Sequence, residues 1–84
     1  MKHKALVLRI DQASIALLQG KEGAGNEYLS QVFDELLQLS VSFTPQTLKC
    51  LTPLMEIMHD AQQRRDHIYL VDILQYELPK HIEL

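Results

Sequence analysis

The sharpest chemical pattern in the sequence is a polar strip in its last third. Arg65, Tyr69, Asp72 and Tyr76 follow one another at spacings of three and four residues, so on a helix their side chains share one face. A carboxylate between two phenols can orient a ligand, or it can accept hydrogen bonds from tyrosine hydroxyls at a protein interface. We expect the interface role, in which replacing Asp72 by alanine weakens association.

A second pattern, Glu56-x-x-His59, resembles half of the di-metal carboxylate sites found in helical bundles. On a helix, however, Glu56 falls opposite the apolar stripe, together with Asp60, Gln63 and His67, which predicts a solvated polar face. We therefore predict no metal ligands within one chain. The alternative is a metal- or ligand-binding bundle formed across a dimer from two Glu56/His59 pairs.

The single cysteine, Cys50, lies between Leu48 and Leu51 and is expected to be a small buried hydrophobe. Nothing in the sequence brings together a nucleophile, a base and an orienting group, so we predict a protein that is not an enzyme and needs no cofactor. One cysteine permits no internal disulfide, which suits a reducing cytoplasm.

Composition limits the classes of function. The 84 residues suit a single domain, residues 1–84, and so short a chain often oligomerises to gain stability. A net charge of −3 disfavours a nucleic-acid-binding domain, including a helix-turn-helix regulator, because such domains are usually basic. No apolar run approaches the roughly 20 residues that cross a bilayer, so we predict no membrane contact and a cytoplasmic location.

These residues must be positioned by helices, and apolar spacing predicts an all-α, up-down bundle of three main helices. The first covers residues 3–19, with Leu8, Ile15 and Leu18 widening its stripe so that it would be buried on two sides. Gly20–Gly25 would form a linker, and Asn26 would cap the second helix. The predicted core stripes are Leu6, Ile10, Ala13 and Leu17, then Leu29, Val32, Phe33, Leu36, Ser40 and Phe43.

The third helix is predicted to be long. Thr44-Pro45 would start a short turn over 45–51, Thr52-Pro53 would start the helix, and Pro79 would end it, giving about residues 53–78. Its core stripe, Leu54, Ile57, Met58, Ala61 and Ile68, runs into the polar strip about halfway along. Either the helix breaks near 62–66 with Asp66 capping a new helix, or it runs straight for about 39 Å and overhangs the others.

We favour the straight helix, with a homodimer covering the overhang. Leucines that turn away from the core in that half would then be exposed, as at an interface. The predicted interface residues are Arg65, Tyr69, Leu70, Asp72, Ile73, Leu74, Tyr76 and Leu78. The sequence thus predicts a non-catalytic protein–protein interaction module, a homo-oligomerising adaptor or regulator.

The end of the chain carries one recognisable pattern, an alanine four residues before a basic residue and aspartate, followed by Leu-x-Asp-x-Leu-x-Tyr-Glu-Leu-Pro. It resembles a family of small helical proteins from Gram-positive bacteria. The resemblance covers about a quarter of the chain and implies an all-helical fold without implying an activity. The matching positions are Ala61, Arg65, Asp66, Leu70, Asp72, Leu74, Tyr76, Glu77, Leu78 and Pro79.

Overall fold

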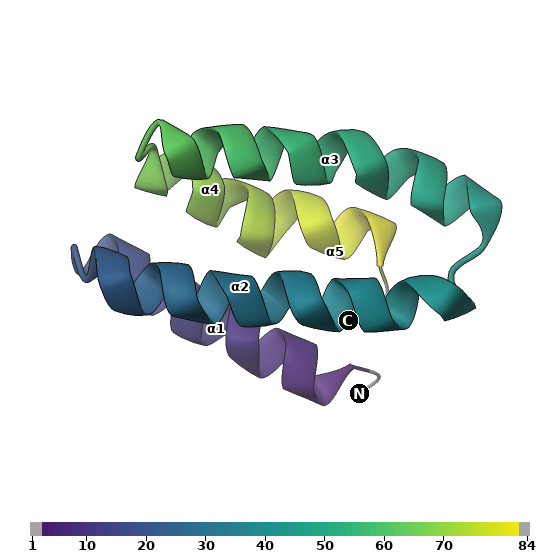
Figure 1. Ribbon diagram of the computed structural model, residues 1–84, viewed down its shortest axis with the longest axis horizontal. Coiled ribbons are helices and arrows are strands. Elements are labelled where there is room, and N and C mark those ends of the chain that lie inside the picture. The colour runs from purple at the N-terminus through teal and green to yellow at the C-terminus, as the bar shows by residue number, and fades with distance from the viewer. Residues whose placement is uncertain (1–2, 83–84) are drawn as a thin grey trace.

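The computed structural model describes residues 3–82, and over this range the chain is helical with no strand, as predicted. Four helical segments replace the predicted three, each running antiparallel to the one before (Figure 1). They are α1 (Lys4–Leu18), α2 (Glu22–Leu39), α3 (Pro45–Gln63) and a last segment made of α4 (His67–Asp72), a π-helical turn (Ile73–Glu77) and α5 (Leu78–His81); a 3-10 turn, Ser40–Ser42, follows α2.

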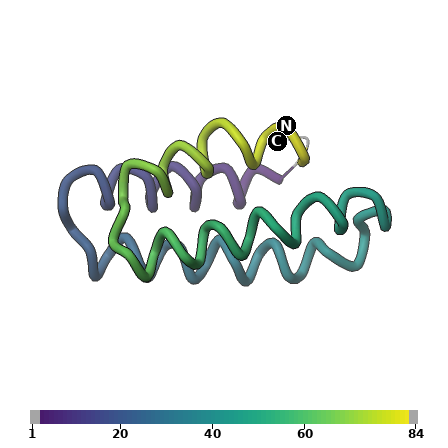
Figure 2. The backbone as a smooth tube through the Cα atoms, turned by 90° about the horizontal axis from the view of Figure 1, so that it is seen from above, coloured from purple at the N-terminus to yellow at the C-terminus, as the bar shows by residue number. Residues whose placement is uncertain are grey.

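The helices form two layers, seen most clearly from above (Figure 2). One layer holds α1 and the α4–α5 segment, and the other holds α2 and α3. The closest packing is between α1 and α2, and the α4–α5 segment packs on both α1 and α3. The core between the layers contains most of the predicted stripes, including Leu6, Ile10, Ala13, Leu17, Leu29, Val32, Leu36, Leu54, Met58 and Ala61.

The predicted long third helix is wrong, because the chain turns sharply after Gln63. The Asp66 amide donates to the Ala61 carbonyl at 2.9 Å and the Arg65 amide to the Gln62 carbonyl at 3.2 Å, which is the Schellman pattern of a helix end. Asp66 then caps α4 by accepting a hydrogen bond from the Tyr69 amide at 3.2 Å. The break near 62–66, the interpretation not favoured, is the correct one.

This turn reverses which side of the last segment faces inward. The four apolar residues expected to overhang the other helices are each at most 1% exposed, and they fill the chain's own core: Leu70, Ile73, Leu74 and Leu78. Ile68, expected in the core, is 71% exposed instead. The overhang that a second subunit was predicted to cover therefore does not exist.

Arg65 holds this turn in a conformation that glycine adopts more easily. Its φ is +58°, in the left-handed region, and Gly20 occupies the same position at the end of α1 with φ +77°. The left-handed conformation costs an L-residue about 1–2 kcal/mol, whereas glycine adopts it freely. The exposed ion pair from Arg65 Nε to Glu22 Oε1, 3.2 Å long, offsets little of that cost.

We therefore expect Arg65→Gly to raise the free energy of unfolding by about 0.5–1 kcal/mol, after the greater flexibility of the unfolded glycine chain is subtracted. Urea denaturation followed by circular dichroism measures the change. Gly20→Ala is the matched control and should lower the free energy of unfolding by about 1 kcal/mol. A destabilised Arg65→Gly variant would show that the arginine side chain stabilises the turn.

The predicted glycine linker is mostly helix. The loop after α1 is short, and α2 begins at Glu22, so the predicted cap Asn26 lies inside the helix and accepts a hydrogen bond from Gln62 Nε2 at 3.2 Å. Gly25 is buried where α1 and α2 meet, and a Cβ there would lie 2.7 Å from Leu17 Cδ2 and 2.9 Å from its Cγ. The absence of a side chain at Gly25 lets the two helices approach, and this packing outweighs the low helix propensity of glycine.

Two glycines of α2 should therefore respond oppositely to alanine. Gly25→Ala should lower the free energy of unfolding by about 1–3 kcal/mol through overpacking against Leu17. Gly23, with open space around its Cβ position, should accept alanine with a gain of about 0.5 kcal/mol. Thermal unfolding of both variants measures the difference. Similar shifts of the unfolding temperature in the two variants would contradict the claim that Gly25 lets α1 and α2 pack closely.

Contrary to the sequence prediction, Pro53 does not start a helix and Pro79 does not end one. The short turn predicted at 45–51 is part of α3, which starts at the Thr44 cap and continues through Pro53. Pro53 has no amide hydrogen to donate to the Lys49 carbonyl, four residues earlier. Lys49 and Pro53 are both exposed, so water can donate to this carbonyl instead. Pro79 follows the π-helical turn, whose wider winding accommodates a proline ring, so the helix continues to His81.

Candidate functional site

Large apolar side chains remain exposed on the layer formed by α1 and the α4–α5 segment. Five of them are between 55% and 71% exposed, and we call them the α1/α4 face: Leu8, Ile15, Leu18, Ile68 and Tyr76. The prediction that Leu8, Ile15 and Leu18 bury α1 on a second side is thus wrong, because all three are mostly exposed. An exposed apolar group of this size on a small domain is typical of a binding surface.

Two hollows flank the outer side of α1. One, of about 500 Å³, lies between α1 and the α4–α5 segment and is lined by Asp11, Ser14, Ile15, Leu18, Ile68, Val71, Asp72, Gln75 and Tyr76. The other, of about 270 Å³, lies towards α2 and is lined by Gln12, Ile15, Ala16, Gln19, Lys21, Ala24 and Tyr28. Ile15 lines both, so it stands as a ridge between them.

A polar junction holds the larger hollow in shape. Gln75, in the π-helical turn, donates from Nε2 to Ser14 Oγ at 2.9 Å and to Asp11 Oδ1 at 3.2 Å. Ser14 is 4% exposed and its hydroxyl donates to the Ile10 carbonyl at 2.8 Å. These bonds fix the spacing of the two helices. No signal in the sequence could reveal them, because they join residues about sixty positions apart.

The structure divides the polar strip predicted from the sequence. Asp72 and Tyr76 line the larger hollow, whereas Tyr69 is not among its lining residues and Arg65 lies at the turn beside Glu22. Over residues 3–82 no hydrogen bond joins Asp72 to either tyrosine. The interface role of the exposed residues of the strip stays a prediction. Of these residues, Asp72 and Tyr76 share the larger hollow with residues of α1.

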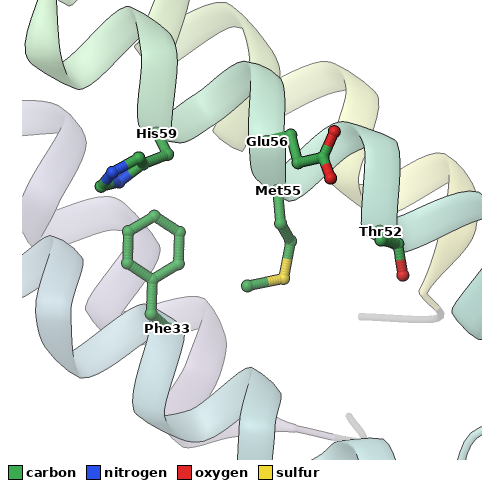
Figure 3. Close-up of a pocket in the computed structure, with 5 residues that line it drawn as sticks. All are labelled: Phe33, Thr52, Met55, Glu56 and His59. Carbon is green, nitrogen blue, oxygen red and sulfur yellow. The ribbon is translucent and has the colours of Figure 1, made fainter.

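A separate groove of about 530 Å³ lies between α2 and α3 and is lined by Phe33, Thr52, Met55, Glu56 and His59. Phe33 from α2 and Met55 from α3 point toward one another across it, while Glu56 and His59 lie apart along α3 (Figure 3). His59 Nε2 is 3.1 Å from Gln63 Nε2 on its own helix. We call this the α2/α3 groove.

The described part of the chain contains no group of three or more histidine, cysteine or acidic side chains placed to hold a metal ion. A site built from two Glu56/His59 pairs would need a second copy and stays a prediction. Cys50 is half-buried rather than fully buried. None of the helices within residues 3–82 has the length and apolar character needed to cross a membrane.

Comparisons of the chain with protein-family models, with curated protein sequences and with solved structures find no match. The α1/α4 face and the α2/α3 groove are the two surfaces through which the described part of the chain could bind a partner.

Proposed function

We propose that this protein is a non-catalytic interaction module that forms a homodimer through its α1/α4 face. The observation that carries the proposal is that four large, mostly exposed apolar side chains line one hollow, namely Ile15, Leu18, Ile68 and Tyr76. Leu8, also mostly exposed, lies two turns before Ile15 on α1. At about 100 Å² of uncovered surface each, these five side chains offer on the order of 500 Å² per copy and 1,000 Å² per pair, near the lower limit for a specific interface.

The shape of the face supports a second copy as its occupant. A two-fold dimer brings the same patch of both copies together, so the patch must fit itself. Here the Ile15 ridge lies directly beside the hollow between α1 and the α4–α5 segment. A two-fold axis can therefore seat the ridge of each copy in the hollow of the other.

The spacing along α1 supports the same arrangement. Leu8 and Ile15 are seven residues apart and Leu18 follows three later, which is the a and d spacing of helices that pack against each other. In the proposed dimer the up-down bundle of each copy is a rigid support, and the two α2/α3 layers face outward. Such an arrangement suits an adaptor or regulator that presents two equal surfaces.

Sedimentation equilibrium of the full chain, from low to high micromolar concentration, tests the proposal. We expect a single dimeric species that dissociates only on dilution. A monomer at every concentration, or an open series of larger species, would contradict a two-fold dimer.

A further inference from the structure

The layer formed by α2 and α3 is the acidic side of the molecule. The two helices contain six carboxylates, namely Glu22, Glu27, Asp34, Glu35, Glu56 and Asp60, and one basic residue that is charged at neutral pH, Lys49. Their net charge is thus −5, more negative than the −3 of the whole chain, so the remaining residues are net positive. Two of the six, Asp60 and Glu22, pair with Arg64 and Arg65 just after α3. The attraction of a positively charged ligand to this layer therefore rests on the other four, Glu27, Asp34, Glu35 and Glu56.

The α2/α3 groove gives this acidic layer an apolar centre. A hydrogen bond from Gln62 Nε2 to Asn26 Oδ1 joins α3 to α2. Phe33 and Met55 are partly buried and pack against the hydrophobic core at the groove. Leu37, one turn after Phe33, is 71% exposed, and Leu48, two turns before Met55, is 38% exposed. The apolar strip therefore extends along both helices.

The lengthwise apolar strip of the α2/α3 groove suits a helix more than a small molecule. Side chains spaced by four residues on α2 and by seven on α3 present a lengthwise strip, which is how an amphipathic helix is held in a groove. The groove is open to the surface rather than enclosed. Asp34 on α2 and Glu56 on α3 are exposed on either side and would face the edges of a bound helix.

We propose that the α2/α3 groove binds an amphipathic helix of a partner protein whose apolar face is flanked by lysine or arginine. Apolar contacts with Phe33, Leu37, Leu48 and Met55 supply affinity, and the surrounding carboxylates select for positive charge. The groove lies on the layer opposite the α1/α4 face, so it does not compete with dimerisation. A dimer would hold two such helices.

The probe is a synthetic amphipathic peptide of about eighteen residues, with leucine on one face and lysine on the other, labelled for fluorescence anisotropy. Two control peptides keep its length: one replaces every lysine by glutamate, and the other replaces every leucine by serine. We expect the leucine–lysine peptide to bind at least about tenfold more tightly than either control, because both the apolar and the charge contribution are needed.

Variants locate the binding. Leu37→Lys and Met55→Lys should each weaken binding of the leucine–lysine peptide by at least about tenfold. Leu37 is mostly exposed, so its variant should fold normally even if Met55→Lys does not. Ile15→Lys and Ile68→Lys, on the opposite layer, are the controls and should leave peptide affinity within about twofold, whether or not they remain dimeric.

Three results would overturn the proposal. They are equal binding of the leucine–glutamate peptide, equal binding of the serine–lysine peptide, and loss of binding in the Ile15 and Ile68 variants rather than in the groove variants. The peptide titration does not require a dimer and can be run on a monomeric variant. Failure of the proposed dimerisation and failure of peptide binding in the α2/α3 groove are therefore distinguishable.

Discussion

Replacing Leu70 by alanine lowers the free energy of unfolding by about 2–5 kcal/mol, the largest loss of stability expected from any single substitution considered for this chain. Leu70 is fully buried beneath α1 and α3, and its removal leaves a cavity that the surrounding helices cannot close. Small domains are stable by only about 5–15 kcal/mol. The Leu70→Ala variant should therefore be largely unfolded at moderate urea concentrations.

The matched control is Ile68→Ala, two residues earlier on the same helix and 71% exposed. It should change the free energy of unfolding by no more than about 0.5 kcal/mol. Urea denaturation of both variants at a concentration where each is monomeric isolates the fold from association. The opposite ranking, with Ile68 essential and Leu70 tolerant, would mean that the last segment turns its other face to the core.

Replacing Ile15 by lysine should convert the proposed dimer to a monomer. Ile15 forms the ridge between the two hollows, so the substitution places a charge at the centre of the proposed interface, where it loses water and gains no partner. We expect the dissociation constant of the dimer to rise by at least about a hundredfold, as at a central interface residue. Sedimentation equilibrium measures the shift.

Leu37→Lys is the control for Ile15→Lys, because Leu37 is also mostly exposed but lies in the α2–α3 layer. It should leave dimerisation unchanged. Both variants should keep the wild-type helix content, since neither position reaches the core, and Leu37→Lys should also keep the wild-type unfolding temperature. Ile15→Lys should unfold at a lower temperature, because it loses the stabilisation that association gives the folded state. If Leu37→Lys dissociates the dimer and Ile15→Lys does not, the copies associate through the α2/α3 groove.

The sequence contains enough information to predict an all-helical chain and most of its core, because the stripes of α1, α2 and α3 follow helical spacing. It also shows that the apolar face of the last third changes near Arg65. It does not show whether the helix runs straight and overhangs the others or ends near 62–66 and turns back. A helix end of this kind usually carries glycine, and here an arginine adopts the left-handed conformation.

That single turn accounts for the errors at the candidate site. With a straight helix, Leu70 and Leu74 would be exposed and Ile68 buried, whereas the turn exchanges their positions. Leu8, Ile15 and Leu18 were expected in the core because the spacing shows which residues are apolar and not how many helices are present to cover them. The Gln75–Ser14 contact depends on the π-helical turn, which no local pattern predicts.

Distances between spin labels show directly which face of the protein forms the proposed dimer. In a Cys50→Ser background, a single cysteine introduced at Gln19 or at Ser30 carries one label per chain, so any defined distance requires a second copy. Gln19 borders the α1/α4 face, whereas Ser30 lies on α2 in the opposite layer of a molecule measuring 35 × 24 × 19 Å. We expect double electron–electron resonance to give a short distance, below about 30 Å, for Gln19, and a distinctly longer one for Ser30. No defined distance at either position, or a shorter distance at Ser30, would contradict a dimer formed through the α1/α4 face.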